Sequence, residues 1–140
     1  MAKRSCREGF ETLTPGRDTS GVDRLFTVDE ARSLLAEIRG SLEIFIERRA
    51  AFAQLRWALD HDPASADGGV AELKAFEAHL DALLTSLRDR GIQVKGFAPL
   101  LLDFPAMLDG QSVLLCWLEG DEGLAWYHRT EFGFMGRRPL

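Results

Sequence analysis

The sequence has only two cysteines in 140 residues, which excludes a fold held by a disulfide framework. Cys6 lies in a polar N-terminal stretch and Cys116 lies in an apolar run. We therefore expect both thiols to be reduced, as they are in cytoplasmic proteins. The basic start at residues 1–4 is not followed by an apolar segment, so we expect no secretory signal.

Long apolar runs and an excess of basic residues are also missing. No run approaches the roughly 18 residues that a membrane span needs, so we expect no membrane association. The net charge is −5, and the basic residues alternate with acidic ones. Because nucleic-acid surfaces carry clustered basic charge, we expect no nucleic-acid partner. The length fits one domain with a modest core.

Two long helices are predicted for the first two thirds of the chain, after a flexible leader at residues 1–25. Thr27 and Glu30 have the spacing of a capping box, and apolar residues follow in a heptad pattern until Pro63 ends the helix near residue 60. A second heptad pattern runs from Val70 to Arg90, where Gly91 is a typical residue after a helix end. The short connection at 63–69 makes the helices antiparallel neighbours, so residues 26–91 form a helical hairpin.

After Gly91 the apolar period changes from that of a helix to that of strands. Residues 92–95 alternate, residues 97–102 are an apolar run, and Asp109-Gly110 is a turn signal. Residues 113–118 and 124–129 then read as two strands joined by a five-residue loop. We predict an α+β fold in which a long antiparallel helical hairpin precedes a small C-terminal antiparallel β unit at residues 92–140, the two forming one domain.

The reactive side chains of the sequence are concentrated in this β unit. If Leu118 pairs with Leu124 across the loop between the last two strands, then Cys116 lies opposite Trp126, and Leu114 lies opposite His128. Cys116 and His128 are then diagonal neighbours on one face. A shift of two residues would place them directly opposite, whereas a shift of one would separate them onto different faces. The loop length does not choose among these registers.

A transition metal, zinc or iron, is one interpretation of this group. Cysteine and histidine are good ligands for both metals, and Asp103 could add an oxygen, so the predicted metal ligands are Cys116, His128 and Asp103. The sequence lacks the C-x-x-C and H-x-x-x-H spacings of familiar metal sites. The alternatives are a buried structural Cys116 with His128 as a polar strand-end residue, or a Cys–His nucleophile that would also need an oxyanion hole.

A small-molecule ligand is the other functional interpretation of the β unit. Aromatic side chains can wall an apolar pocket, and an arginine held rigidly by the glycine- and aromatic-rich residues before it can bind a carboxylate or a phosphate. Core packing of the aromatic residues and a solvated arginine tail are the alternatives. The predicted ligand-binding residues are Trp117, Trp126, Tyr127, Arg137 and Arg138. No motif identifies catalytic residues, so the sequence leaves open whether the protein is an enzyme.

The helical hairpin suggests a second class of function, that of an interaction or scaffold protein. Two helices leave each heptad seam half covered, and exposed apolar stripes usually find a partner. A homodimer with helices in its interface is therefore expected.

The chain also resembles a family of small prokaryotic proteins catalogued as domain of unknown function 2203. The resemblance covers residues 26–140 and implies no established activity, cofactor or partner. The family often has Gly-Glu where Gly120-Asp121 stands here, and Trp-His where Tyr127-His128 stands. The segments that carry the resemblance are Phe26–Ala31 with Leu34-Leu35, Gly91–Lys95, Asp103–Pro105, Gly110, Val113–Trp117, Trp126–His128 and Gly133–Leu140.

Overall fold

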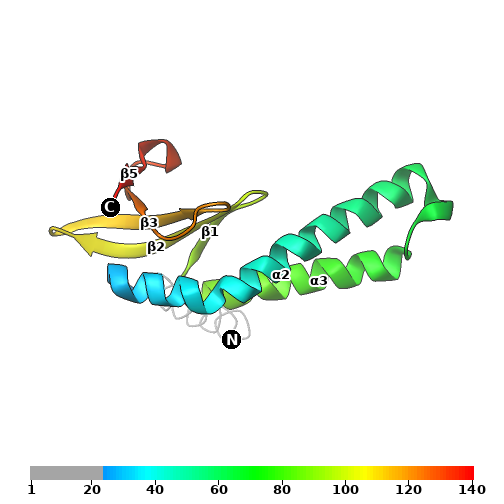
Figure 1. The fold of residues 1–140 in the computed structure, drawn as a ribbon, viewed down its shortest axis with the longest axis horizontal. Helices are drawn as coiled ribbons and strands as arrows, with labels where there is room; N and C mark the ends of the chain where they lie inside the picture. Colours follow the sequence, from blue (N-terminus) through cyan, green and yellow to red (C-terminus); the bar gives the residue numbers. More distant parts are fainter. Residues whose placement is uncertain (1–23) are drawn as a thin grey trace, which may run out of the picture. The chain divides into compact units, whose positions relative to one another are not determined.

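The computed structural model describes residues 24–140, so the leader predicted for residues 1–25 lies outside it except for Arg24 and Leu25. Two helices precede a five-stranded antiparallel sheet, which confirms the predicted α+β class (Figure 1). Within residues 24–140, neither helix has the length and apolar character needed to cross a bilayer. The elements are α2 (Val28–His61), the 3₁₀ turn η1 (Pro63–Ser65), α3 (Val70–Asp89), β1 (Gln93–Phe97), β2 (Leu100–Leu108), β3 (Gln111–Leu118), β4 (Trp126–Arg129), η2 (Phe134–Gly136) and β5 (Arg138–Pro139).

Helix α2 begins at the predicted capping box. The Thr27 amide donates to Glu30 Oε1 at 2.8 Å, and the Glu30 amide donates to Thr27 Oγ1 at 3.0 Å. The hydrogen bond from the Thr27 backbone lowers the pKa of the Glu30 carboxyl, because it favours the charged form. Just before this cap, the Phe26 amide donates to the Pro105 carbonyl at 2.7 Å. The start of α2 is therefore attached to strand β2.

Helix α3 ends in the Schellman motif that Gly91 predicts. The Gly91 amide donates to the Arg88 carbonyl at 2.9 Å, and the Ile92 amide donates to the Leu87 carbonyl at 3.2 Å. Gly91 has a φ of +90°, a conformation that a side chain would strain. This motif turns the chain out of the helix and into β1.

The chain divides into two compact units: residues 33–86 form one, and the described part of 1–32 with 87–140 forms the other. In the first unit, α2 and α3 run antiparallel and are joined through η1 (Figure 1). The α2 heptad seam is buried as far as Phe45; beyond it Leu55 is buried, whereas Phe52 and Leu59 are only partly covered. The single-domain organisation expected for residues 26–140 stays a prediction.

The sheet is larger than the predicted hairpin because residues 100–108 form a long central strand, β2. The strands pair in sequence order, β1-β2-β3-β4-β5, and every pair is antiparallel. Pro105 lies inside β2, at a position beyond the last residue that pairs with β1. Among the described residues, this side of β2 meets the isolated bridge of Phe26 with Ala106, in which the Pro105 carbonyl accepts from the Phe26 amide, so the missing proline N–H breaks no ladder bond.

Strands β3 and β4 pair in the register first considered from the sequence: Leu114 faces His128 and Cys116 faces Trp126. Side chains alternate between the two faces of the sheet. One face carries the buried apolar residues Leu102, Phe104 and Leu115, and the Phe104 ring meets Phe26 edge-on at 5.5 Å. The opposite face carries Asp103, Cys116 and His128, which brings the polar side chains of three strands together.

The capping box predicts a measurable loss of stability on removal of one side chain. Thr27→Ala should lower the free energy of unfolding by about 1 kcal/mol, because the Glu30 amide loses its acceptor. Thr27→Ser keeps the hydroxyl and should remain close to the native value. Urea unfolding followed by circular dichroism measures both, and equal stability of all three proteins would contradict the role of the cap.

Candidate metal centre

Three neighbouring strands place the predicted metal ligands on one face of the sheet. Asp103 on β2 pairs with Cys116 on β3, and His128 on β4 lies two residues beyond Trp126, the partner of Cys116. One ligand atom from each side chain, a carboxylate oxygen, the sulfur and a ring nitrogen, lies within 4.8 Å of the other two. Cys116 and His128 thus share one face with Asp103, in the first of the registers considered from the sequence.

The cluster is almost completely removed from solvent, with exposed fractions of 2% for Asp103, 0% for Cys116 and 4% for His128. Nε2 of His128 lies 3.2 Å from Oδ2 of Asp103. Nδ1 of the same ring lies 3.0 Å from the Arg129 carbonyl oxygen. Because a carbonyl only accepts, Nδ1 carries a proton, and Nε2 is the nitrogen that faces the carboxyl group.

The Asp103 carboxyl group is incompletely satisfied. Its Oδ2 contacts His128 and lies 4.0 Å from the ammonium of Lys95 on β1, whose side chain is 46% exposed. Among the residues that the structure describes, none donates a hydrogen bond to the buried Oδ1. Buried carboxylate oxygens normally have partners, so this atom marks a position where a positive group would be stabilised.

Burial raises the pKa of the Cys116 thiol from 9.0 to about 12. The negative charge of Asp103 acts in the same direction, and the positive charge of Arg137 acts against it. The thiol is therefore protonated at neutral pH. Since the thiolate is the nucleophilic form, this environment disfavours the Cys–His nucleophile considered from the sequence.

A cavity of about 230 Å³ lies beside the cluster. Asp103 and His128 contribute to its wall, together with Lys95 at its polar side. The segment that follows β4 supplies aromatic side chains, and the sheet supplies two leucines. The complete lining is Lys95, Leu101, Asp103, Leu114, His128, Thr130, Glu131, Phe132, Gly133 and Phe134.

Arg137 is held rigidly, as the glycine- and aromatic-rich segment before it suggests. Its Nη2 donates to Asp121 Oδ2 at 2.6 Å, and its guanidinium lies 4.8 Å from the ring centre of Trp126 and 5.0 Å from that of Phe134. The same Asp121 oxygen accepts the Leu118 amide at 3.0 Å. Arg137 thus fastens the C-terminal segment to the β3–β4 loop.

The other predicted ligand-binding residues are divided between the two faces of the sheet and its last strand, where Arg138 pairs with Tyr127. Trp126 shares the face of Cys116, whereas Trp117 and Tyr127 lie on the opposite face by strand alternation. Trp117 is buried and its Nε1 donates to the Asp121 carbonyl at 3.0 Å. Arg138 is exposed in β5. None of these residues, nor Arg137, lines the cavity beside Asp103.

Lys95 is the site residue that sequence reasoning missed. The pairing of β1 with β2 is irregular between Val94 and Gly96, so that Lys95 has no partner in the ladder and reaches Asp103. Gly96 is the signal that could have located this bulge, since glycine inside a strand often marks one. A Cβ on Gly96 would lie 3.1 Å from the Pro99 carbonyl oxygen, which explains the glycine.

The chemistry of the three donors suits a transition metal. One nitrogen, one oxygen and one sulfur ligand match the preferences of zinc and of iron(II). Metal-binding histidines commonly donate their second N–H to a backbone carbonyl, which fixes the ring, and the bond from Nδ1 of His128 to Arg129 has this form.

Comparison with known proteins places the chain in a family without assigning it an activity. The family model DUF2203, described as an uncharacterised conserved protein, matches residues 24–140. Because the match covers most of the chain, the protein belongs to this family, as the resemblance implied. No curated protein and no solved structure gives a significant match.

The raised pKa of Cys116 predicts a pH-dependent stability. The folded state keeps the thiol proton between pH 9 and about 12, where the unfolded state loses it. The contribution is therefore complete below pH 9 and falls by up to about 1.4 kcal/mol per pH unit above it. Cys116→Ala removes this dependence while the other alkaline titrations remain.

Urea unfolding of the metal-free protein at about pH 8 and about pH 10.5 measures the effect. The native chain should lose roughly 2 kcal/mol more than Cys116→Ala over this interval. Equal losses of unfolding free energy in both proteins would show that folding does not raise the pKa of the Cys116 thiol.

Proposed function

We propose that this protein is a cytoplasmic metal-binding protein whose ligands are Asp103, Cys116 and His128. The observation that carries the proposal is the geometry of the cluster: three different donor atoms lie within 4.8 Å of one another in a buried site, and Oδ1 of Asp103 has no donor among the described residues. A cation at this point would supply the positive charge that the carboxyl group lacks. Zinc and iron(II) fit this donor set best.

The protonated thiol is compatible with this proposal. Metal ions bind cysteine as the thiolate, so binding would release the Cys116 proton and the metal charge would replace it. The His128 ring needs no flip, because Nδ1 already donates its proton to the Arg129 carbonyl. The ring could therefore offer Nε2 to a metal once the proton that Nε2 shares with Oδ2 of Asp103 is released.

Three protein ligands are typical of metal sites that keep a position for water or substrate. Asp103 and His128 both line the cavity, which would supply the fourth ligand from that side. A metal held here would polarise a bound molecule or activate a bound water.

Zinc titration of the metal-free protein tests this proposal. We expect one zinc ion per chain by calorimetry and elemental analysis, with a rise in melting temperature because the ion binds the folded state. Cys116→Ser and His128→Gln each remove one donor while keeping side chains of similar size. Each should weaken zinc binding by more than about tenfold.

Tyr127→Phe is the matched control, since Tyr127 lies on the other face of the sheet and should bind zinc normally. Circular dichroism establishes that each variant is folded before its affinity is compared. If the native protein binds neither zinc nor iron(II), or if folded Cys116→Ser and His128→Gln bind as tightly as the native chain, the proposed metal site is wrong.

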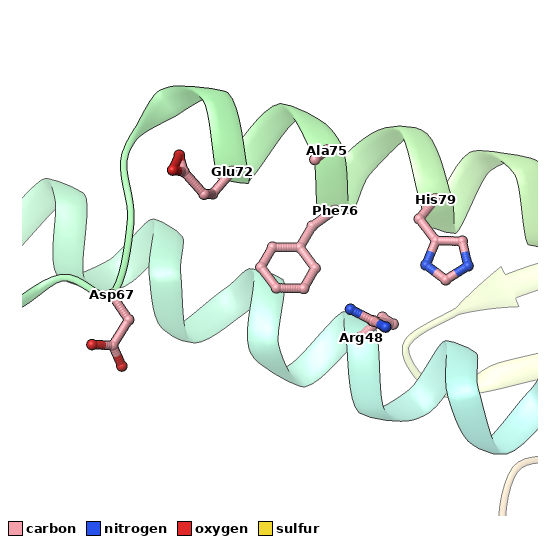
Figure 2. Close-up of a pocket in the computed structure, with 6 residues that line it drawn as sticks. All are labelled: Arg48, Asp67, Glu72, Ala75, Phe76 and His79. Atoms are coloured by element: carbon pink, nitrogen blue, oxygen red, sulfur yellow. The ribbon is translucent and has the colours of Figure 1, made fainter.

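We also propose a second role, self-association through the helical hairpin. Several large apolar side chains of this unit are exposed, among them Trp57 at 59%. A groove of about 410 Å³ lies between the helices near their connection. Figure 2 shows the Phe76 ring extending from α3 into it, with Asp67 and Glu72 toward one end and Arg48 and His79 toward the other.

A second copy of the hairpin is the occupant that fits this groove. In a two-fold pairing the same surface meets itself in the reverse direction, so the acidic end of one copy would face Arg48 of the other. Such complementarity of charge would fix the pairing, and the apolar residues would supply its area. The two helices of each copy would together form a four-helix arrangement.

Light scattering on the full chain tests the dimer. We expect a dimer at micromolar concentration, and Arg48→Glu should shift it to monomer because like charges then meet across the pairing. Arg56→Glu, an exposed charge reversal on the same helix, should leave the dimer intact. A native monomer, or equal effects of the two variants, would contradict the proposal.

A further inference from the structure

We infer that the cavity beside the cluster binds a small carboxylate with an apolar body, which Lys95 anchors once the metal is in place. This inference rests on the proposed metal site and names the kind of molecule that would reach it. Three features support it: the position of Lys95, the composition of the cavity wall, and the neutralisation of the Asp103 and Cys116 charges by a bound metal.

The cavity has a polar side and an apolar side. Lys95, Asp103 and His128 form the polar side. Leucines of the sheet and the aromatic rings of the segment after β4 form the rest, namely Leu101, Leu114, Phe132 and Phe134. Its volume of about 230 Å³ is below the range of about 300–1,000 Å³ found for pockets of drug-sized ligands. A single ring or a short chain with one polar group therefore suits it.

The charge of Lys95 determines the sign of that polar group. In the metal-free protein the ammonium lies 4.0 Å from Oδ2 of Asp103, so the two charges largely offset each other. A divalent cation bound by the Asp103 carboxylate and the Cys116 thiolate would neutralise both ligands. The Lys95 ammonium would then be the uncompensated charge beside the cavity, and it would favour an anion.

Lys95 can move to such an anion without disturbing the sheet. Its side chain is 46% exposed and arises at the irregular point of β1, so its long stem is not fixed in the core. Glu131 also lines the cavity, and it is exposed, as Lys95 is, so solvent screens both charges. We expect the attraction of an anion in direct contact with the Lys95 ammonium to outweigh the screened repulsion from Glu131.

A monocarboxylate fits these features better than a phosphate. Tight phosphate recognition generally uses several donors or a bidentate arginine, whereas this cavity offers one lysine. Arg137 is already paired with Asp121 and does not line the cavity. The apolar side of the wall would remain unused by inorganic phosphate, which makes an organic acid the better match.

Calorimetric titration of zinc-loaded full-length protein with benzoate tests the inference. Benzoate presents one carboxylate and one ring, and benzamide is its neutral analogue. We expect benzoate to bind at least tenfold more tightly than benzamide. Lys95→Met keeps the aliphatic stem without the charge and should weaken benzoate at least tenfold while zinc binding remains. Lys74→Met, a change at an exposed lysine of the helical unit, should alter neither affinity.

The outcomes separate this inference from the proposed metal site. Zinc binding without benzoate binding, equal affinity for benzamide, or an unchanged affinity in Lys95→Met would overturn the carboxylate site and leave the metal site standing. If benzoate binds the metal-free protein equally tightly, the metal is not what leaves the Lys95 charge uncompensated, and that part of the inference is wrong. Failure of the native chain to bind zinc would overturn the metal site, and the carboxylate site with it.

Discussion

The buried contact between Asp103 and His128 is the interaction on which the arrangement of the sheet depends. A carboxyl group removed from water is destabilising unless charged or hydrogen-bonding partners surround it. Asp103 lies between Leu102 and Phe104, whose side chains occupy the fully buried apolar face. A shift of β2 by one residue would bring the carboxyl group into that apolar face and expose two large apolar side chains. The contact with His128 therefore favours one register across three strands.

The polar face in turn needs the C-terminal segment that follows β4. Lys95 approaches the cluster from β1, and Phe132 and Phe134 wall the cavity beside it. The ion pair of Arg137 with Asp121 attaches this segment to the β3–β4 loop, and β5 pairs with β4. Arg137, which does not line the cavity, thus helps to hold the segment that encloses the cluster. Residues after 129 contribute to the site by enclosing it, whether or not they touch a ligand.

Local signals predicted the helices well, and long-range packing decided what the sequence could not predict. The capping box at Thr27 and the Schellman motif at Gly91 involve residues close together in the chain, so their spacing alone indicated the helix ends. Strand β2 was not predicted, since residues 97–102 were described only as an apolar run, and Pro105 is a residue type that is unfavourable inside most strands. The loop between β3 and β4 allowed several registers, and the choice among them depends on Asp103, which no local pattern connects with His128. Lys95 was missed because its position results from a bulge.

The question that remains for the cluster is whether its polar groups stabilise one another without a ligand. A structural network is favourable when each buried polar atom has a partner, since each unsatisfied atom carries a desolvation penalty of roughly 1–3 kcal/mol. Oδ2 of Asp103 and both ring nitrogens of His128 meet this condition, but Oδ1 does not within the described part of the chain. Burial keeps the Cys116 thiol protonated, and in this form the thiol also interacts with the Asp103 carboxyl group through a side-chain hydrogen bond. A bound cation would neutralise the carboxylate, convert the thiol to a ligand and use Nε2 of His128, so one event would account for all three side chains.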